Sequence, residues 1–189
     1  MYIFTSLLAI MSTLIVNNHN GPTYHVLQKQ ENYELRRYDS WIVAETIIEG
    51  THQDAGSEAF SRLGGYIFGK NEGGVKIEMT APVTQFQVGP GKYAVQFYMP
   101  AEWTLESLPK PTDSRVVLKQ IPERTLFTVR YNGNWSEDLY QKEEFALLKE
   151  AEVEKISLKL ESQPIWARYN SPMAPTFLRT NEVMYEVKA

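Results

Sequence analysis

Cysteine is absent from this chain of 189 residues, and histidine occurs only three times, at His19, His25 and His52. Without cysteine the protein has no disulfide bonds, thiolate zinc sites, cysteine nucleophiles or cofactors attached through cysteine. Three scattered histidines are too few for a multi-histidine metal site, and none stands near a nucleophile-elbow motif. These absences argue against the common zinc and Ser-His-acid chemistries.

Clusters of positive charge are missing as well. The chain has 19 Lys and Arg residues against 23 Asp and Glu residues, which gives a net charge of −4, and it contains no run of basic residues. Nucleic-acid binding requires a clustered excess of Lys and Arg, so we expect no nucleic-acid partner. A hydrophobic content of 43% over this length favours one soluble domain with a single core, which we expect to be a monomer.

An uncharged apolar stretch, residues 1–16, opens the chain. It is shorter than the roughly 20 residues that a membrane-spanning helix needs, so we expect no integral membrane span. Its length suits the core of an export signal, although no Lys or Arg precedes it and no small-x-small cleavage motif follows. We interpret residues 1–22 as a leader (an export signal, a membrane tether or an incorrectly assigned start) and residues 23–189 as the folded domain. A signal would make the protein periplasmic or extracellular; otherwise we expect it in the cytoplasm.

The first half of the predicted domain combines strand patterns with one helix. Residues 33–38 alternate in the two-residue period of a half-buried strand, and Trp41–Glu49, rich in β-branched residues, is predicted to pair with it across a tight turn. Thr51 and Asp54 form a capping-box pattern that begins a helix extending to about residue 68. Two further strands are predicted at residues 83–88 and 93–99.

The second half repeats this order. Residues 116–121 and 125–131 are predicted to form a strand pair, and a capping pattern at Asn134 begins a helix to about residue 152. Strands at residues 165–169 and 182–187 close the chain. The two predicted helix starts, Thr51 and Asn134, are 83 residues apart. We therefore predict an α+β fold in which two related units share one antiparallel sheet system.

Short motifs in a fixed order extend over nearly the whole predicted domain. They are Tyr33-Glu34-x-Arg36-x-Tyr38, Phe60-x-x-Leu63-x-x-Tyr66-Ile67-x-Gly69-x-Asn71, Lys76-Ile77-x-Met79-Thr80-Ala81-Pro82-Val83, Phe97-x-Met99-Pro100, Tyr169-Asn170-x-Pro172 and Arg179-x-Asn181-Glu182-Val183. In these motifs the chain resembles the SOUL haem-binding protein family from about Tyr24 to the C-terminus. The resemblance implies a distorted eight-stranded antiparallel β-barrel flanked by two helices, built from two β-α-β-β-like pseudo-repeats.

The resemblance also implies a non-enzymatic protein that binds haem or another tetrapyrrole without covalent attachment, as a buffer or carrier. The ligand is expected in a shallow apolar groove between the first helix and the loop before the last strand. Arg62 and Arg179 are the cations available for the two propionates. The remaining groove residues, carried over position by position, are Ser57, Phe60, Ser61, Gly64 and Gly65 on the helix, and Tyr169, Met173, Ala174 and Phe177 on the loop.

The chain departs from the family at two informative positions. Arg37 stands where an axial histidine was once proposed, and arginine stays protonated and cannot ligate iron. Ala174 replaces a cation that some members have in the loop. His52 is predicted to lie on an exposed loop near the first helix. We therefore expect no obligatory protein ligand to the iron and no metal site.

Other interpretations of the same residues remain open. In these interpretations Phe60 packs against the sheet, Gly64 and Gly65 allow close helix–strand contact, and Arg179 stabilises a turn. A second class of function is a tetrapyrrole-modifying enzyme such as a dechelatase, which needs an acid or base in the groove. A third is a protein-interaction module without a ligand. The nearest acid–base candidates for the enzyme are Glu58, Tyr66 and Glu78.

Overall fold

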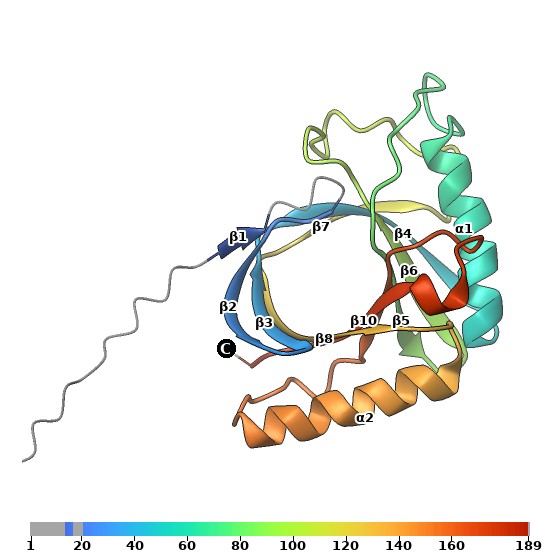
Figure 1. The fold of residues 1–189 in the computed structure, drawn as a ribbon. Coiled ribbons are helices and arrows are strands. Elements are labelled where there is room, and N and C mark those ends of the chain that lie inside the picture. The colour runs from blue at the N-terminus through green and yellow to red at the C-terminus, as the bar shows by residue number, and fades with distance from the viewer. Residues whose placement is uncertain (1–13, 17–20, 189) are drawn as a thin grey trace, which may run out of the picture.

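The computed structural model describes residues 14–16 and 21–188 (Figure 1). Most of the predicted leader, residues 1–13 and 17–20, lies outside the described residues. The described chain forms ten strands, two α-helices and one short 3-10 turn. In chain order these are β1 (Leu14–Val16), β2 (Tyr24–Gln30), β3 (Tyr33–Tyr38), β4 (Trp41–Glu49), α1 (His52–Ile67), β5 (Val83–Gly89), β6 (Lys92–Tyr98), β7 (Val117–Ile121), β8 (Arg124–Asn132), α2 (Glu137–Val153), β9 (Ile165–Arg168), η1 (Thr176–Leu178) and β10 (Thr180–Glu186).

The strands form one antiparallel sheet in the order β1-β2-β3-β8-β10-β9-β5-β6-β4-β7. The sheet curls round, and both helices pack on its outer side (Figure 1). α1 packs on β4 and β6, whereas α2 packs on β8 and β10. The α+β fold, the curled antiparallel sheet and the two flanking helices are confirmed. All eight predicted strands are present as β3 to β10, and β1 and β2 extend one edge.

The predicted hairpins are wrong. β3 pairs with β2 and β8, with Tyr33 opposite Val129, and makes no ladder with β4. β4 pairs instead with β6 and β7, with Trp41 opposite Ile121. Each unit therefore gives its first strand to the other: β3 extends β8-β10-β9, and β7 extends β5-β6-β4. As a result β4 lies between β6 and β7, and β8 lies between β3 and β10, so the exchanged strands join the two units into one sheet.

The predicted repeat is nevertheless visible in the strands. β4 begins at Trp41 and β8 begins at Arg124, which is again a separation of 83 residues. Each is followed by a helix and then by two more strands. The two units thus follow the same plan within one sheet.

Helix α1 begins as its sequence predicts. The Thr51 side-chain oxygen accepts a hydrogen bond from the Asp54 backbone N–H at 3.2 Å, and the Thr51 hydroxyl donates to the Asp54 carboxylate at 2.7 Å. These bonds satisfy a donor that the first helical turn otherwise leaves unpaired. The side chains that pack on the sheet recur every four residues along one face, which is the spacing of an amphipathic helix. They are Ala55, Ala59, Leu63 and Ile67.

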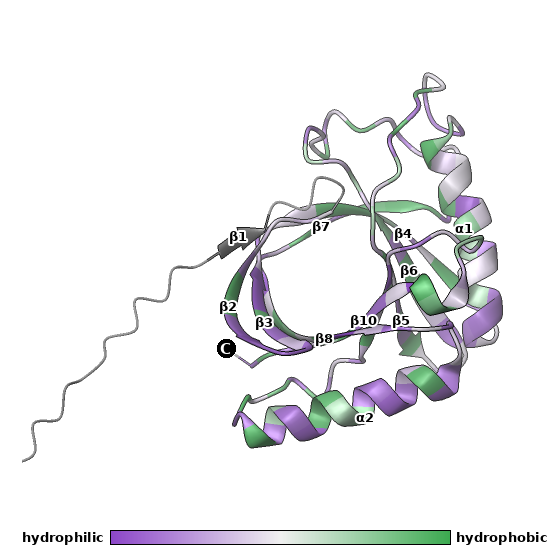
Figure 2. Ribbon diagram, in the orientation of Figure 1, coloured by the Kyte–Doolittle hydropathy of each residue, from purple (hydrophilic) through white to green (hydrophobic). Residues whose placement is uncertain are grey.

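Helix α2 begins two residues later than the predicted cap. Its N-cap is Ser136, whose hydroxyl accepts from the Leu139 N–H, and not Asn134. Hydrophilic and hydrophobic residues alternate along this helix (Figure 2), and its buried residues Tyr140, Leu147 and Ala151 face the sheet. Since the helix starts at residue 137, the segment before it remains a loop that is free to form a wall beside α1. Within residues 14–16 and 21–188, no helix combines the length and apolar character needed to span a bilayer.

Candidate functional site

A groove with a volume of about 860 Å³ lies between α1 and the loops that flank α2 and β10. This size is typical of sites that bind drug-sized ligands. Four segments far apart in the sequence meet there, together with Arg179, which follows the last of them. The lining residues are Gln53, Gly56, Ser57 and Phe60 from α1; Met79, Thr80, Ala81 and Val83 at the entry to β5; Asn134, Trp135 and Ser136 before α2; Arg168, Tyr169, Asn170, Ser171 and Pro172 from β9 and its loop; and Arg179.

Apolar side chains from α1 and the β5 entry form one wall of the groove. Phe60 stacks edge to face on Phe97, with ring centroids 5.6 Å apart, yet 37% of the residue remains exposed. Met79 is 39% exposed in the same groove. Phe60 therefore serves both alternatives that the sequence left open, because one edge packs on the sheet and the rest is available to a ligand. Aromatic and thioether groups suit a flat apolar surface.

Four of the eleven predicted site residues line this groove. They are Ser57, Phe60, Tyr169 and Arg179. Ser61 and Arg62 instead line a smaller groove of about 210 Å³ elsewhere on α1. A residue two positions after Phe60 is rotated by about 200° round the helix, so Arg62 cannot share its face. Arg62 pairs with Glu58 and donates to the Thr46 hydroxyl at 2.8 Å.

The predicted glycine pair also lies outside the groove lining. A Cβ on Gly64 would meet only the Phe68 ring at 3.7 Å, and one on Gly65 would meet the Lys70 side chain at 3.0 Å. The structure thus shows neither a ligand surface nor a close strand contact at these two positions. The glycine that matters at the groove is Gly56, where an added Cβ would lie 2.6 Å from Nη1 of Arg168. Sequence reasoning missed it, because the approach of Arg168 is a tertiary contact.

The loop before β10 points its apolar side chains outward. Met173 is 89% exposed and Phe177 is 73% exposed, and neither lines the groove. The backbone of this loop is held by Arg179, whose Nε donates to the Ala174 carbonyl at 2.9 Å and whose Nη2 donates to the Pro172 carbonyl at 2.6 Å. The alternative role for Arg179, a turn-stabilising device, is therefore real, and it coexists with a position at the groove wall.

Arg168 is the groove residue that sequence reasoning most clearly missed. Its Nε donates to the Tyr140 hydroxyl at 3.0 Å and its Nη2 donates to Oε1 of Gln85 at 3.1 Å. Its guanidinium carbon lies 5.2 Å from the centroid of the Trp135 ring, and that of Arg179 lies 4.4 Å from the same centroid. A charged residue that ends a buried strand, next to the Tyr169 motif, was the signal available in the sequence.

His52 is buried, contrary to the prediction that it lies on an exposed loop. It is the first residue of α1, is 5% exposed, and packs edge to face on Trp166 at a centroid distance of 4.7 Å. Burial, and secondarily the nearby charge of Arg168, lower the pKa of His52 to about 4. The imidazole is therefore neutral at physiological pH. It does not line the groove.

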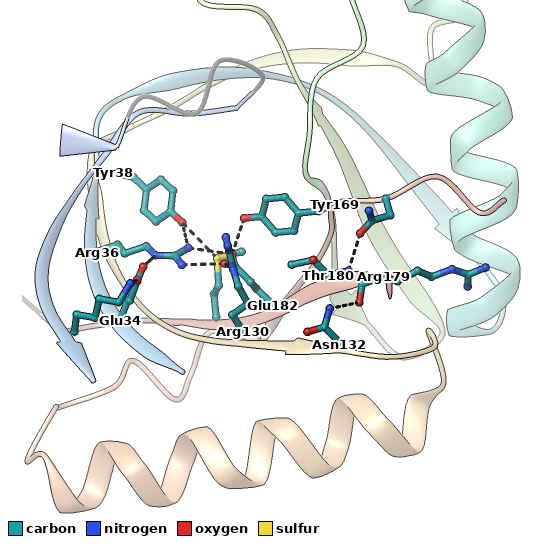
Figure 3. Close-up of polar contacts among 12 residues, drawn as sticks. Glu34, Arg36, Tyr38, Arg130, Asn132, Tyr169, Arg179, Thr180 and Glu182 are labelled. Atoms are coloured by element: carbon teal, nitrogen blue, oxygen red, sulfur yellow. Dashed lines mark hydrogen bonds and ion pairs between the residues drawn. The ribbon is translucent and has the colours of Figure 1, made fainter. Parts of the chain in front are cut away.

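Tyr169 is tied to a buried charge network inside the curled sheet (Figure 3). Glu182, fully buried, accepts from Arg36 at 2.9 and 3.0 Å, from Nε of Arg130 at 2.9 Å, and from the Tyr169 hydroxyl at 2.6 Å. Burial, followed by the Glu182 charge, raises the pKa of Tyr169 well above 10. The phenol therefore stays protonated, and its ring is held in place at the groove wall.

The acid–base candidates of the enzymatic interpretation do not meet at this groove. Tyr66 is buried and donates to the Pro109 carbonyl at 3.0 Å, and Glu58 pairs with Arg62. Glu78 lines a separate groove of about 710 Å³. None of the described residues that line the candidate groove is a carboxylate or a histidine. Within residues 14–16 and 21–188, no group of three or more His, Cys, Asp or Glu residues is arranged to hold a metal ion.

Comparison with known proteins gives a consistent result. A family model described as "SOUL heme-binding protein" matches residues 19–186. The chain is 32% identical over 161 residues to "Heme-binding protein 2" of Homo sapiens, a match that covers 80% of this chain and 76% of that protein. The protein of the same name in Mus musculus is 32% identical over 162 residues, with the same coverage.

Solved structures with much lower sequence identity share the fold. The C-terminal domain of EcmrR superposes with a TM-score of 0.61 at 13% identity, covering 82% of this chain and 96% of that chain. A protein described as a hydrolase from Listeria innocua gives a TM-score of 0.60 at 13% identity, covering 86% of this chain and 94% of that chain. At this level of identity the likeness extends to the fold alone.

Proposed function

Because the chain belongs to the SOUL heme-binding protein family, we propose that it binds haem or a related tetrapyrrole without covalent attachment, as a carrier or buffer. The observation that carries the proposal is the groove of about 860 Å³, which combines an apolar wall with guanidinium groups. A tetrapyrrole is flat and apolar, and it carries acidic substituents at one edge. The groove offers surfaces of both kinds.

The apolar wall supplies the main attraction. Phe60, Met79 and Val83 lie at the groove, where they would pack against the ring of the bound pigment. A bound haem supplies a planar ring with a redox-active iron. The protein contributes the shape of the groove, the removal of water from the ring faces and the orientation of the acidic edge.

Iron ligation by the protein is not part of this proposal. The groove offers two side chains with an atom of the right kind, the Met79 thioether and the Tyr169 hydroxyl. The Tyr169 phenol is held protonated by burial and by its bond to Glu182, which disfavours phenolate ligation. Binding through the ring and its acidic edge predicts that metal-free protoporphyrin binds about as tightly as haemin.

The same lining supports binding without catalysis. A dechelatase needs a group that gives or takes protons beside the ring. The described lining residues contain no carboxylate or imidazole, and the Tyr169 hydroxyl is engaged with Glu182.

Titration of the full chain with haemin and with protoporphyrin, followed at the Soret band, tests the proposal. We expect a shifted, saturable band for both ligands. Phe60→Asp should weaken binding at least tenfold, because a carboxylate is placed against the apolar ring. Phe145→Asp is the matched control, since Phe145 is 60% exposed on α2 and outside the groove.

Two results would contradict the proposal. One is a spectrum identical to that of free haemin, with no saturation. The other is equal weakening by the two Asp variants, which would place the binding elsewhere. Turnover of a metalloporphyrin during incubation would favour the enzyme, and a protein partner with no pigment affinity would favour the interaction module.

A further inference from the structure

We propose that Arg168 and Arg179 form an anion-binding subsite against Trp135, and that the groove therefore selects flat apolar ligands bearing free acidic groups. The inference rests on the proposed function, because it concerns the same groove. It adds the residues that select for the acidic groups, and in particular Arg168, which forms part of neither the helix wall nor the loop wall expected from the sequence.

The charges of these two arginines are uncompensated within the described chain. Neither Arg168 nor Arg179 lies within ion-pair distance of a carboxylate among residues 14–16 and 21–188, although both are half-buried. Five other arginines do have such partners: Arg36, Arg62, Arg115, Arg124 and Arg130. A partly buried charge without a counter-charge is unfavourable. A ligand that brings negative charge into the groove relieves this cost.

Neutral groups hold the Arg168 guanidinium in place. Its acceptors are the Tyr140 hydroxyl and Oε1 of Gln85, and Nη2 lies 3.5 Å from Nε2 of His52. Because Tyr140 and Gln85 are themselves almost fully buried, the guanidinium is fixed before any ligand arrives. A fixed donor loses little conformational entropy on binding, which favours affinity.

Arg179 is fixed in a comparable way. Its Nε and Nη2 donate to the carbonyls of Ala174 and Pro172, and its guanidinium packs on the Trp135 ring. Figure 3 shows its side chain extending toward α1 and away from Glu182. The Trp135 indole is itself anchored, since its Nε1 donates to Asn181 at 2.8 Å. One rigid aromatic ring thus supports two cations.

Each guanidinium has one nitrogen whose N–H groups are available to a ligand. Among the described residues, Nη1 of Arg168 and Nη1 of Arg179 donate to no protein acceptor, while the Nε and Nη2 atoms of both are used. Nη1 of Arg168 lies against Gly56, where the missing side chain leaves room for it. Carboxylates are preferred partners of such donors, and esters are much weaker acceptors.

Comparing protoporphyrin with its dimethyl ester in the same solvent tests the subsite. We expect the wild-type protein to bind the free acid at least tenfold more tightly than the ester. Arg168→Gln should lower the affinity for the free acid by about tenfold and leave the affinity for the ester unchanged. Arg37→Gln is the matched control, because it removes one positive charge from the exposed side of β3. It should preserve the preference for the acid.

A second variant moves the guanidinium without removing its charge. Gly56→Ala places a Cβ where Nη1 of Arg168 now lies, so the guanidinium must shift. Alanine also has a higher helix propensity than glycine, which offsets part of the cost of disturbing the bonds from Arg168 to Tyr140 and Gln85, so this variant should still fold. We expect it to lose most of the preference for the acid while remaining folded, with the same affinity for the ester as the wild type. If Arg168 had only a structural role, the preference for the acid would not be lost from a variant that still folds.

The outcomes separate the subsite from the proposed function. Equal affinity for acid and ester overturns the subsite and leaves tetrapyrrole binding intact. An acid preference that survives Arg168→Gln also overturns it. If neither porphyrin binds, the proposed function fails, and 1-pyrenebutyrate with its methyl ester then decides the subsite by fluorescence. Arg168-dependent binding of the pyrene acid alone would support the subsite, and its absence would overturn it.

Discussion

At the scale of single residues, buried charged groups link strands that are far apart in the sequence. Arg36 and Glu182 come from two separate sequence motifs and meet inside the sheet (Figure 3). The sequence marked both motifs, but it gave no sign that their charges pair. Pairing across 146 positions depends on which strands become neighbours, and local pattern does not determine that.

Glu182→Gln should destabilise the protein strongly. The change removes the charge that compensates Arg36 and Arg130, and a broken buried ion pair typically costs about 3–5 kcal/mol. Urea unfolding measures this loss as a lower midpoint. The ion pair between Lys29 and Glu34 provides the comparison, because Lys29 is exposed. Lys29→Gln should lower the free energy of unfolding by less than about 1 kcal/mol. Similar costs for the two variants would contradict the role assigned to the network.

His52 should make the folded state sensitive to acid. The pKa of His52 is about 4 in the folded protein against 6.5 when exposed, so the unfolded chain takes up the proton first as the pH falls. The free energy of unfolding should therefore decrease between pH 6.5 and about 4, by about 3 kcal/mol from this residue. Urea midpoints across this range, compared with His52→Phe, isolate the contribution. An equally steep decrease in the variant would rule it out.

At the scale of elements, helix N-caps are easier to predict from sequence than the pairing of strands. Thr51 and Asp54 predict the start of α1 correctly, because the hydrogen bonds of this cap form between residues only three positions apart. The sequence predicts Asn134 as the cap of α2, because Glu137 follows it three residues later, as in a capping box. Ser136 occupies the cap position, and the residues before it serve the groove instead. Local chemistry limits the choice, but tertiary packing selects among neighbouring candidates.

Two alanine substitutions distinguish the predicted cap from the observed one. Ser136→Ala removes the oxygen that accepts from Leu139 N–H and should lower the free energy of unfolding by about 1 kcal/mol. Asn134→Ala should change it by less than about 0.5 kcal/mol, because Asn134 caps no helix turn. Chemical denaturation of the two variants gives the answer. A larger loss for Asn134→Ala would restore the cap inferred from the sequence.

At the scale of the whole molecule, strand positions followed from the sequence and strand pairing did not. The eight predicted strands are found because each has a period of two or a run of β-branched residues. Their neighbours were assigned wrongly, since a short link such as Asp39-Ser40 looks like a hairpin turn whichever way the chain leaves it. For the groove, Phe60, Tyr169 and Arg179 lie in recognisable motifs and were predicted. Arg168 was not, because its place at the groove depends on tertiary contacts with Tyr140 and Gln85.

The exchange of first strands predicts that neither half of the domain folds alone. A fragment ending at residue 110 lacks β7 and retains β3 without its partner β8; a fragment beginning at residue 111 has the converse defect. Each alone should show poorly dispersed amide resonances. Mixed, the two fragments should regain dispersed spectra and a cooperative unfolding transition. Native-like spectra from either fragment by itself would refute this.

The reciprocal strand exchange also bears on how such a molecule can arise. A chain holding one β-β-α-β-β unit would have a surplus strand and a vacant sheet edge, and two copies would satisfy each other by trading that strand. The present protein has the layout of such an intertwined pair joined into one polypeptide. In this protein the two units have different roles at the groove: the first contributes the apolar face of α1, and the second contributes Arg168 and Arg179.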